Sequence, residues 1–160
     1  MVWGCFASNI RGPLAVCHGH IKAVQYINIL KKNLLPFIET LPDSIKNDVS
    51  FQQDNATIHR AHVSQGWFAD NEITVVEWPL NSPDMNPIEY VWKALKAKLH
   101  ARFPDTYALK GGPERVQEEL AKWLQVVWAE LEEEVFERLI SSMPARVQAL
   151  YEAKGWYTGY

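Results

Sequence analysis

Apolar residues at the start of the chain form two short runs separated by residues typical of turns. Residues 1–7 read MVWGCFA and residues 14–17 read LAVC, while residues 8–13 (SNIRGP) lie between them. Short apolar runs bounded by Ser, Asn, Gly and Pro favour strands joined by a tight connection. The pattern therefore predicts a β-hairpin over residues 1–17.

The next segment changes to helical periodicity. Between residues 22 and 37, apolar side chains recur at Val24, Ile27, Leu30 and Leu34, and Pro36 follows them. This spacing puts the four side chains on one face of a helix. Because proline removes a helical hydrogen bond, we expect the helix to end near Pro36.

Residues 49–76 alternate between strand-like and helix-like patterns. Residues 49–54 and the β-branched run at 73–76 read as strands, and residues 60–69 between them read as a short helix. We expect the run at 73–76 to be a buried parallel strand. A strand–helix–strand order indicates an α/β sheet.

A well-marked helix is predicted after residue 86. Asn86 is a favourable N-cap, Pro87 suits the first helical position, and Glu89 lies three residues after the cap. An apolar stripe then runs beside a charged one, which puts Glu89 at the boundary between core and solvent. The apolar stripe comprises Ile88, Trp92, Leu95 and Leu99, and the charged stripe comprises Glu89, Lys93, Lys96 and His100.

The last third of the chain has helical patterns only. We expect helices over 113–131, over 135–143 and from Ser142 to Lys154, with Gly155 ending the last one. The chain thus divides into an α/β part, residues 1–110, and a helical part, residues 111–160, within one predicted domain.

Composition limits the classes of function. The 160 residues are 48% apolar, enough for a core, and the net charge is −3, unlike a free-standing DNA-binding module. Cys5 and Cys17 lack the spacing of a metal or redox motif, and free thiols are expected. No apolar run approaches the roughly 18 residues of a membrane span, so we expect a soluble intracellular protein without a membrane or small-molecule partner.

Two acidic positions are the strongest candidates for chemistry. Asp54 ends the predicted strand within FQQDNA (51–56), and Glu89 lies in the first turn of the helix after SPDMNP (82–87). If the fold brings them together, two carboxylates can hold Mg²⁺, which prefers oxygen ligands. Two simpler interpretations stay open: Asp54 as the residue of an Asx turn, and Glu89 as half of a capping box with Asn86 or as a partner of Lys93.

Other polar residues are candidates for supporting roles. His59 and His62 are three residues apart, but the sequence offers no further ligand for a closed zinc site. His59 is the better candidate for orienting a group near Asp54. Lys93 and Lys96 are candidates for contacts with DNA phosphates, although a solvated helix face is the default interpretation.

The two acidic motifs, together with WPLNSPDMNPIE (78–89), MVWGCF (1–6) and SMPARV (142–147), resemble the DDE domain of Tc/mariner transposases. The resemblance covers nearly the whole chain. It implies an RNase H-like α/β fold with a mixed sheet flanked by helices, and DNA cleavage and strand transfer with two Mg²⁺ or Mn²⁺ ions. It assigns Asp54 and Glu89 as catalytic metal ligands, with Asn55, His59 and Asn86 as supporting residues.

The resemblance also implies parts that this sequence does not contain. The family's first catalytic acid lies on a central strand that precedes the Trp-Gly-Cys strand, and a helix-turn-helix DNA-binding region lies further upstream. We therefore expect a DDE domain without its first central strand, with weak metal binding and no activity on its own. The alternative is a transposon relic or a module retained to bind DNA or a protein. The resemblance further implies DNA as a partner, a possible homodimer and a nuclear location in a eukaryotic host.

Overall fold

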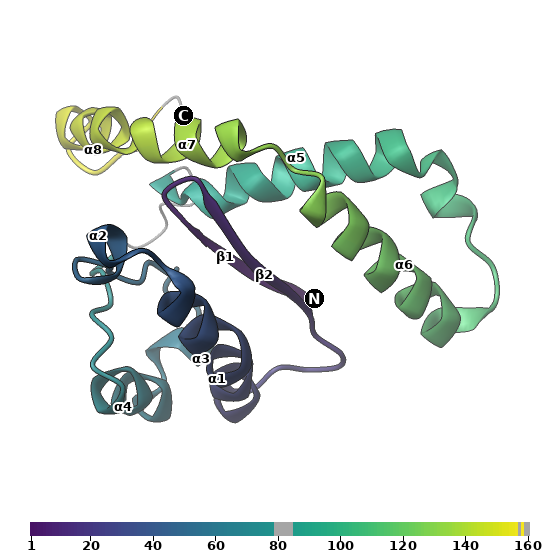
Figure 1. Cartoon of the computed structure of the whole chain (residues 1–160), viewed down its shortest axis with the longest axis horizontal. Helices are drawn as coiled ribbons and strands as arrows, with labels where there is room; N and C mark the ends of the chain where they lie inside the picture. The colour runs from purple at the N-terminus through teal and green to yellow at the C-terminus, as the bar shows by residue number, and fades with distance from the viewer. Residues whose placement is uncertain (79–84, 157, 159–160) are drawn as a thin grey trace.

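A hairpin lies at the centre of the molecule, with helices on both sides (Figure 1). The structure is a computed structural model that describes residues 1–78, 85–156 and 158. Helices α1, α3 and α4 lie on one side of the hairpin, and α5, α6 and α7 lie on the other.

The predicted hairpin is confirmed. Strands β1 (Val2–Ala7) and β2 (Ile10–Val16) are antiparallel, and a register shift between Gly4 and Phe6 marks a bulge. Ser8 begins the two-residue turn with a φ of 54°, in the left-handed region that such turns require.

Helix α1 (Ala23–Thr40) confirms the predicted helix but corrects its end. Pro36 lies inside the helix rather than at its exit, and the helix continues for four more residues. Phe37 is buried one residue later and Leu41 is buried just beyond the helix, so the apolar contacts of this last turn outweigh the hydrogen bond that proline removes. Val24 was expected on the core face, but its side chain is 62% exposed and Tyr26 is buried in its place.

The strand–helix–strand segment has the predicted order but shorter strands. Helices α2 (Asp43–Lys46), α3 (Thr57–Arg60) and α4 (His62–Asp70) are formed, while the two expected strands reduce to one parallel bridge between Phe51 and Val75. The expected parallel pairing at 73–76 is confirmed, but the expected burial is only partial: Ile73 and Val75 pack against the core, whereas Val76 is 38% exposed. The segment at 73–76 lies at an edge and pairs on one side only, which explains both its short pairing and the exposure of Val76.

The C-terminal half is helical, as predicted. It comprises α5 (Pro87–Arg102), the short 3₁₀ helix η2 (Pro104–Ala108), α6 (Gly112–Ala129), α7 (Glu133–Ser141) and α8 (Met143–Glu152). Pro144 lies in the first turn of α8, where its missing N–H costs nothing. Gly155 follows α8 with a φ of 78°, a conformation typical of glycine at helix ends.

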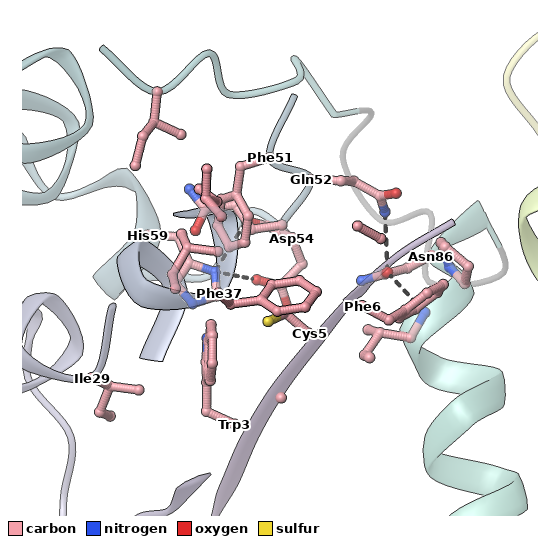
Figure 2. A pocket seen from close by; sticks show the side chains of 18 of the residues that line it. Trp3, Cys5, Phe6, Ile29, Phe37, Phe51, Gln52, Asp54, His59 and Asn86 are labelled. Atoms are coloured by element: carbon pink, nitrogen blue, oxygen red, sulfur yellow. Dashed lines mark hydrogen bonds and ion pairs between the residues drawn. The ribbon is translucent and has the colours of Figure 1, made fainter. Parts of the chain in front are cut away.

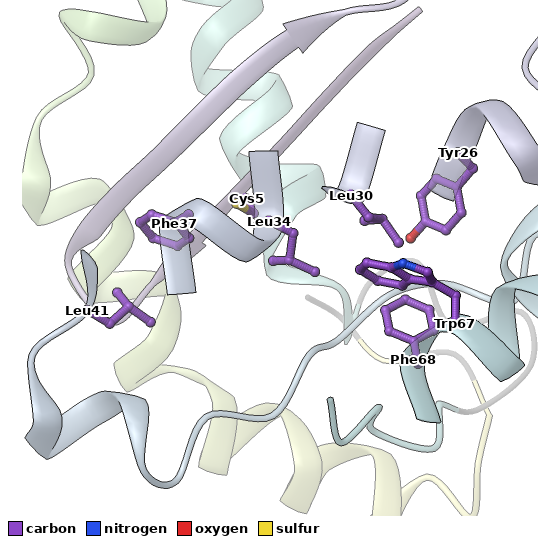
Figure 3. Packing of buried hydrophobic residues seen from close by; sticks show 8 residues of the cluster. All are labelled: Cys5, Tyr26, Leu30, Leu34, Phe37, Leu41, Trp67 and Phe68. Atoms are coloured by element: carbon purple, nitrogen blue, oxygen red, sulfur yellow. The ribbon is translucent and has the colours of Figure 1, made fainter. Parts of the chain in front are cut away.

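The hairpin separates two hydrophobic clusters because side chains alternate across a strand. The α1 cluster contains Cys5 of β1 and seven residues that lie in α1, directly after α1 or in α4 (Figure 3). Trp3 and Ala7 pack against this cluster. The α5 cluster contains Leu14 and buried residues of α5, α6 and α7, and Val2 and Phe6 pack against it. Odd-numbered residues of β1 therefore face α1, and even-numbered residues face α5.

Strand pairing is incomplete on the other edge of β1. The sheet consists of β1 and β2, and among the described residues the Phe51 segment pairs with Val75 but not with the hairpin. No helix in the described part of the chain is both long and apolar enough to cross a membrane.

Candidate active site

A groove of 540 Å³ lies between β1 and the segment that carries Asp54. Both predicted acids, Asp54 and Glu89, line this groove (Figure 2 shows Asp54 with its neighbours). The fold therefore brings to one cavity two carboxylates from different elements: Asp54 follows the Phe51–Val75 bridge, and Glu89 lies in the first turn of α5.

Asp54 has one oxygen engaged within the protein. Its Oδ1 accepts a hydrogen bond from the backbone N–H of Ala56 at 3.0 Å and lies 2.7 Å from Nδ1 of His59. The bond to Ala56 is the Asx turn that the sequence suggested. The side chain of Asp54 is 56% exposed, and no hydrogen bond to its Oδ2 is recorded within the described ranges. Oδ1 thus holds the carboxylate in place, and the side chain stays exposed at the groove.

His59 contacts Asp54 directly, which is the position expected of a residue that orients this carboxylate. Its side chain is 18% exposed, and its ring packs against that of Tyr26 of α1 in a tilted arrangement, with 4.5 Å between the ring centroids. Nδ1 is also 3.2 Å from the backbone oxygen of Asp54. The Tyr26 hydroxyl donates to Oε1 of Gln53, and burial, together with the nearby Asp54 charge, raises the pKa of Tyr26. Tyr26 therefore stays neutral, and it contacts both Gln53, through its hydroxyl, and His59, through its ring.

A hydrogen bond joins the two segments that carry the acids. Gln52 Nε2 donates to Asn86 Oδ1 at 3.0 Å, and Oδ1 also accepts from the Ile88 N–H at 3.4 Å as the N-cap of α5. Gln52 precedes Asp54 by two residues, and Asn86 precedes Glu89 by three. The role of Gln52 was not predicted, although its place in the same short motif as Asp54 was the available signal.

Glu89 does not form the capping box that was one alternative. Its backbone N–H donates to the Asn86 oxygen at 3.1 Å, but among the described residues no side-chain bond from Glu89 to Asn86 and no ion pair with Lys93 is found. Lys93 instead lies with Nζ 4.5 Å from the ring centroid of Tyr90. The Glu89 side chain is exposed at the groove.

The remaining candidates occupy different places. Asn55 Nδ2 donates to the Trp78 carbonyl at 2.8 Å, which fixes the chain after Asp54. Lys96 is exposed on α5. The expected motif residues 79–84 lie outside the described residues.

The candidate ligands at the groove are carboxylates from two different elements. Two exposed carboxylates supply the oxygen ligands that Mg²⁺ prefers and leave room for water and phosphate. In the part of the chain that the structure describes, no group of three or more His, Cys, Asp or Glu residues is arranged to hold a metal. His59 and His62 do not form such a group.

The sequence of the chain is similar to known transposases. Residues 9–110 match a family model described as DDE superfamily endonuclease. The chain is 33% identical to the transposable element Tc1 transposase of Caenorhabditis elegans and 32% identical to the Tcb1 transposase of Caenorhabditis briggsae. It is aligned over 100% of its own length but spans 54% of the length of each of these relatives.

The fold is similar to that of a solved mariner transposase. The Mos1 catalytic domain with Raltegravir and Mg matches 91% of the chain and 69% of that structure's chain, with a TM-score of 0.66 and 23% identity. The Mos1 strand transfer complex matches 91% of the chain with a TM-score of 0.64. These structural matches confirm the RNase H-like fold. The family model and the Tc1 and Tcb1 relatives confirm the resemblance that the motifs indicated.

Proposed function

Because the chain belongs to the DDE superfamily of endonucleases, we propose that Asp54 and Glu89 bind Mg²⁺ or Mn²⁺ in the catalytic domain of a Tc/mariner-type transposase. The observation that supports this most is the Gln52–Asn86 hydrogen bond. It ties the segment ending in Asp54 to the first turn of the helix that bears Glu89. Both carboxylates then line one groove and both are exposed to an incoming ligand.

Each residue of the site has a task that its geometry supports. His59 and the Ala56 N–H hold one oxygen of Asp54, which fixes the position of the carboxylate at the groove. Asn86 fixes the first turn of α5 and with it the position of Glu89. A bound divalent cation supplies charge stabilisation for a phosphodiester undergoing cleavage and lowers the pKa of a bound water.

DNA is the proposed substrate and partner. The solved neighbours include Mos1 in a paired end complex and in a strand transfer complex. Lys93 and Lys96 follow Glu89 on α5 and are exposed, so they are positioned to contact phosphates next to the cleaved bond. With a net charge of −3, binding to DNA would depend on this local pair of charges. A homodimer and a nuclear location remain predictions.

Metal binding can be tested separately from cleavage. We expect saturable Mn²⁺ binding, measured by electron paramagnetic resonance, that weakens at least about tenfold in Asp54→Asn and in Glu89→Gln. Glu133→Gln, an exposed acid at the start of α7 far along the chain, is the matched control and should bind as the wild type does. Equal Mn²⁺ binding in all four proteins would refute the assignment.

Cleavage is measured on a supercoiled plasmid with Mg²⁺ or Mn²⁺. Since the described residues supply two carboxylates and no cluster of three, we expect the chain alone to bind the ion weakly and to nick DNA slowly or not at all. Metal-dependent nicking that persists in both Asp54→Asn and Glu89→Gln would place the chemistry at other residues.

A further inference from the structure

The motif SMPARV, residues 142–147, forms the junction of α7 and α8 and contains a buried arginine. Arg146 is 4% exposed, although Ala145 and Val147 on either side of it are exposed. Removing a guanidinium from water costs free energy that an apolar side chain would not cost. A buried arginine is therefore weak evidence for stability, and its contacts indicate which parts of the fold it holds in place.

Ser142 holds the guanidinium of Arg146 in one orientation. The Ser142 hydroxyl donates to the Leu139 carbonyl at 2.7 Å, which leaves the lone pairs of Oγ as acceptors. Nε of Arg146 donates to this Oγ at 2.8 Å. Lysine has no donor at this position, because it carries its charge on a single terminal nitrogen. The Ser142–Arg146 bond thus fixes the position of a planar, charged group.

This group lies on an aromatic ring of the helix that carries Glu89. Cζ of Arg146 is 4.2 Å from the centroid of the Tyr90 ring, and Tyr90 directly follows Glu89 in α5. An arginine this close to a ring is attracted by the π electrons, and the attraction is larger where water is excluded. The contact joins α8 to the N-terminal end of α5 (Figure 1).

The N-terminal end of a helix frays readily, because its first N–H groups lack partners within the helix. In α5, Asn86 caps this end and accepts from Gln52, while the Tyr90–Arg146 contact holds it from α8. Successive residues of a helix are about 100° apart around its axis. A Tyr90 ring that is fixed against α8 therefore also fixes the direction in which the neighbouring Glu89 leaves the helix.

We propose that Arg146 is a positioning residue for the candidate metal ligand Glu89, acting through the Tyr90 ring and held in place by Ser142. The inference rests on the proposed function, because the direction of Glu89 matters to the reaction only if Glu89 binds the metal ion. In this role Arg146 contacts neither the metal nor DNA. Helix α8 then supports the active site although it lies far from Glu89 in the sequence.

The test measures Mn²⁺ affinity of the 160-residue protein by electron paramagnetic resonance. DNA is left out because Tyr90 also contacts Lys93, a proposed phosphate contact. We expect Arg146→Met and Tyr90→Leu to weaken Mn²⁺ binding at least about fivefold. Tyr90→Phe keeps the ring and should bind as the wild type does. Arg138→Met changes an exposed arginine of α7 in the same way and is the matched control, with unchanged affinity expected.

The sign of the effect separates positioning from charge. Arg146→Met removes a positive charge, and charge alone would make the binding of a cation stronger. Weaker Mn²⁺ binding in this variant therefore indicates a displaced ligand. Two milder variants break the bond to Ser142: Arg146→Lys keeps the charge but lacks the Nε donor, and Ser142→Ala lacks the acceptor. Both should weaken Mn²⁺ binding by a smaller factor than Arg146→Met does.

A double-mutant cycle separates positioning of Glu89 from a general loosening of the fold. If Arg146 acts through Glu89, Arg146→Met should have no further effect on Mn²⁺ affinity in Glu89→Gln but should keep its effect in Asp54→Asn. Circular dichroism verifies that each variant is folded, and Ser142→Ala replaces Arg146→Met in the cycle if the latter does not fold.

Equal effects of Arg146→Met in both backgrounds would overturn the positioning role and leave the metal assignment intact. Wild-type Mn²⁺ affinity in both Arg146→Met and Tyr90→Leu would do the same. Wild-type affinity in Glu89→Gln would instead refute the metal assignment at Glu89, and the positioning role with it.

Discussion

Removing the Asn86 side chain should weaken both the fold and the candidate site. Asn86 is 7% exposed, and its Oδ1 accepts from Ile88 N–H as a helix cap and from Gln52 Nε2 as a bridge. Loss of an N-cap costs about 1 kcal/mol. Loss of a hydrogen bond that leaves a partly buried amide unpaired costs about 1 kcal/mol more. We therefore expect Asn86→Ala to lower the free energy of unfolding by about 2 kcal/mol.

A double-mutant cycle separates the two contributions. Gln52→Ala removes the bridge but leaves the cap, so it should cost about 1 kcal/mol. The double variant should cost no more than Asn86→Ala, because the bridge can be lost only once, which gives a coupling energy of about 1 kcal/mol. Asn86→Asp retains an acceptor for both donors and is the matched control, expected to be close to the wild type.

Equilibrium urea unfolding measures these values, and Mn²⁺ titration of the same proteins measures the site. In a domain of this size, 2 kcal/mol corresponds to a decrease in Tm of about 4–8 °C. Gln52→Ala should also weaken Mn²⁺ binding while the protein stays folded, since Asp54 and Glu89 are then less firmly positioned. A coupling energy near zero, or unchanged Mn²⁺ affinity in Gln52→Ala, would show that the bridge does not join the two acids.

Further predictions concern the core and the thiols. Phe136 is fully buried in the α5 cluster, and Phe136→Ala should cost about 3–5 kcal/mol in urea unfolding, whereas Phe136→Leu should cost clearly less. Gly12→Ala should be destabilising because its Cβ would lie 2.7 Å from the Cys5 backbone oxygen; a protein with unchanged Tm would contradict this packing. Burial raises the pKa of Cys5 to about 12, so Cys5 should resist iodoacetamide at pH 8 in the folded protein and react once urea unfolds it. Since the unfolded thiol loses its proton at lower pH, stability should fall as pH rises from about 9 toward 12, and this part of the fall should be absent in Cys5→Ala.

The sequence predicted elements well wherever local signals agreed. Asn86 followed by Pro87 defined the start of α5 to the residue, because capping is a local interaction between neighbours. The prediction that the helix ends near Pro36 was wrong, because the burial of Phe37 and Leu41 outweighs the local preference of proline. That burial depends on the tertiary fold. The strand at 73–76 was expected to be buried because β-branched residues suit any strand, and only its neighbours decide whether it lies at an edge.

The sequence identified the two acids of the candidate site but not the contacts that join the segments carrying them. Asp54 and Glu89 were identified from their motifs, and both line the groove. The Gln52–Asn86 bond and the contact of Tyr26 with His59 join residues far apart in sequence, and no periodicity predicts such pairs. The capping box of Glu89 was a reasonable local alternative, yet Asn86 caps the helix with its own side chain.

The alternation of β1 between two hydrophobic clusters has a consequence for how the molecule unfolds. A Cβ at position 4 would lie 2.9 Å from the indole of Trp92, so a larger residue there, or a slide of the strand by one residue, would force the indole to move. Loosening β1 would withdraw Trp3 and Cys5 from one side and Val2 and Phe6 from the other at the same time. The two sides should therefore lose their structure in one cooperative transition, and fluorescence and circular dichroism should report the same midpoint.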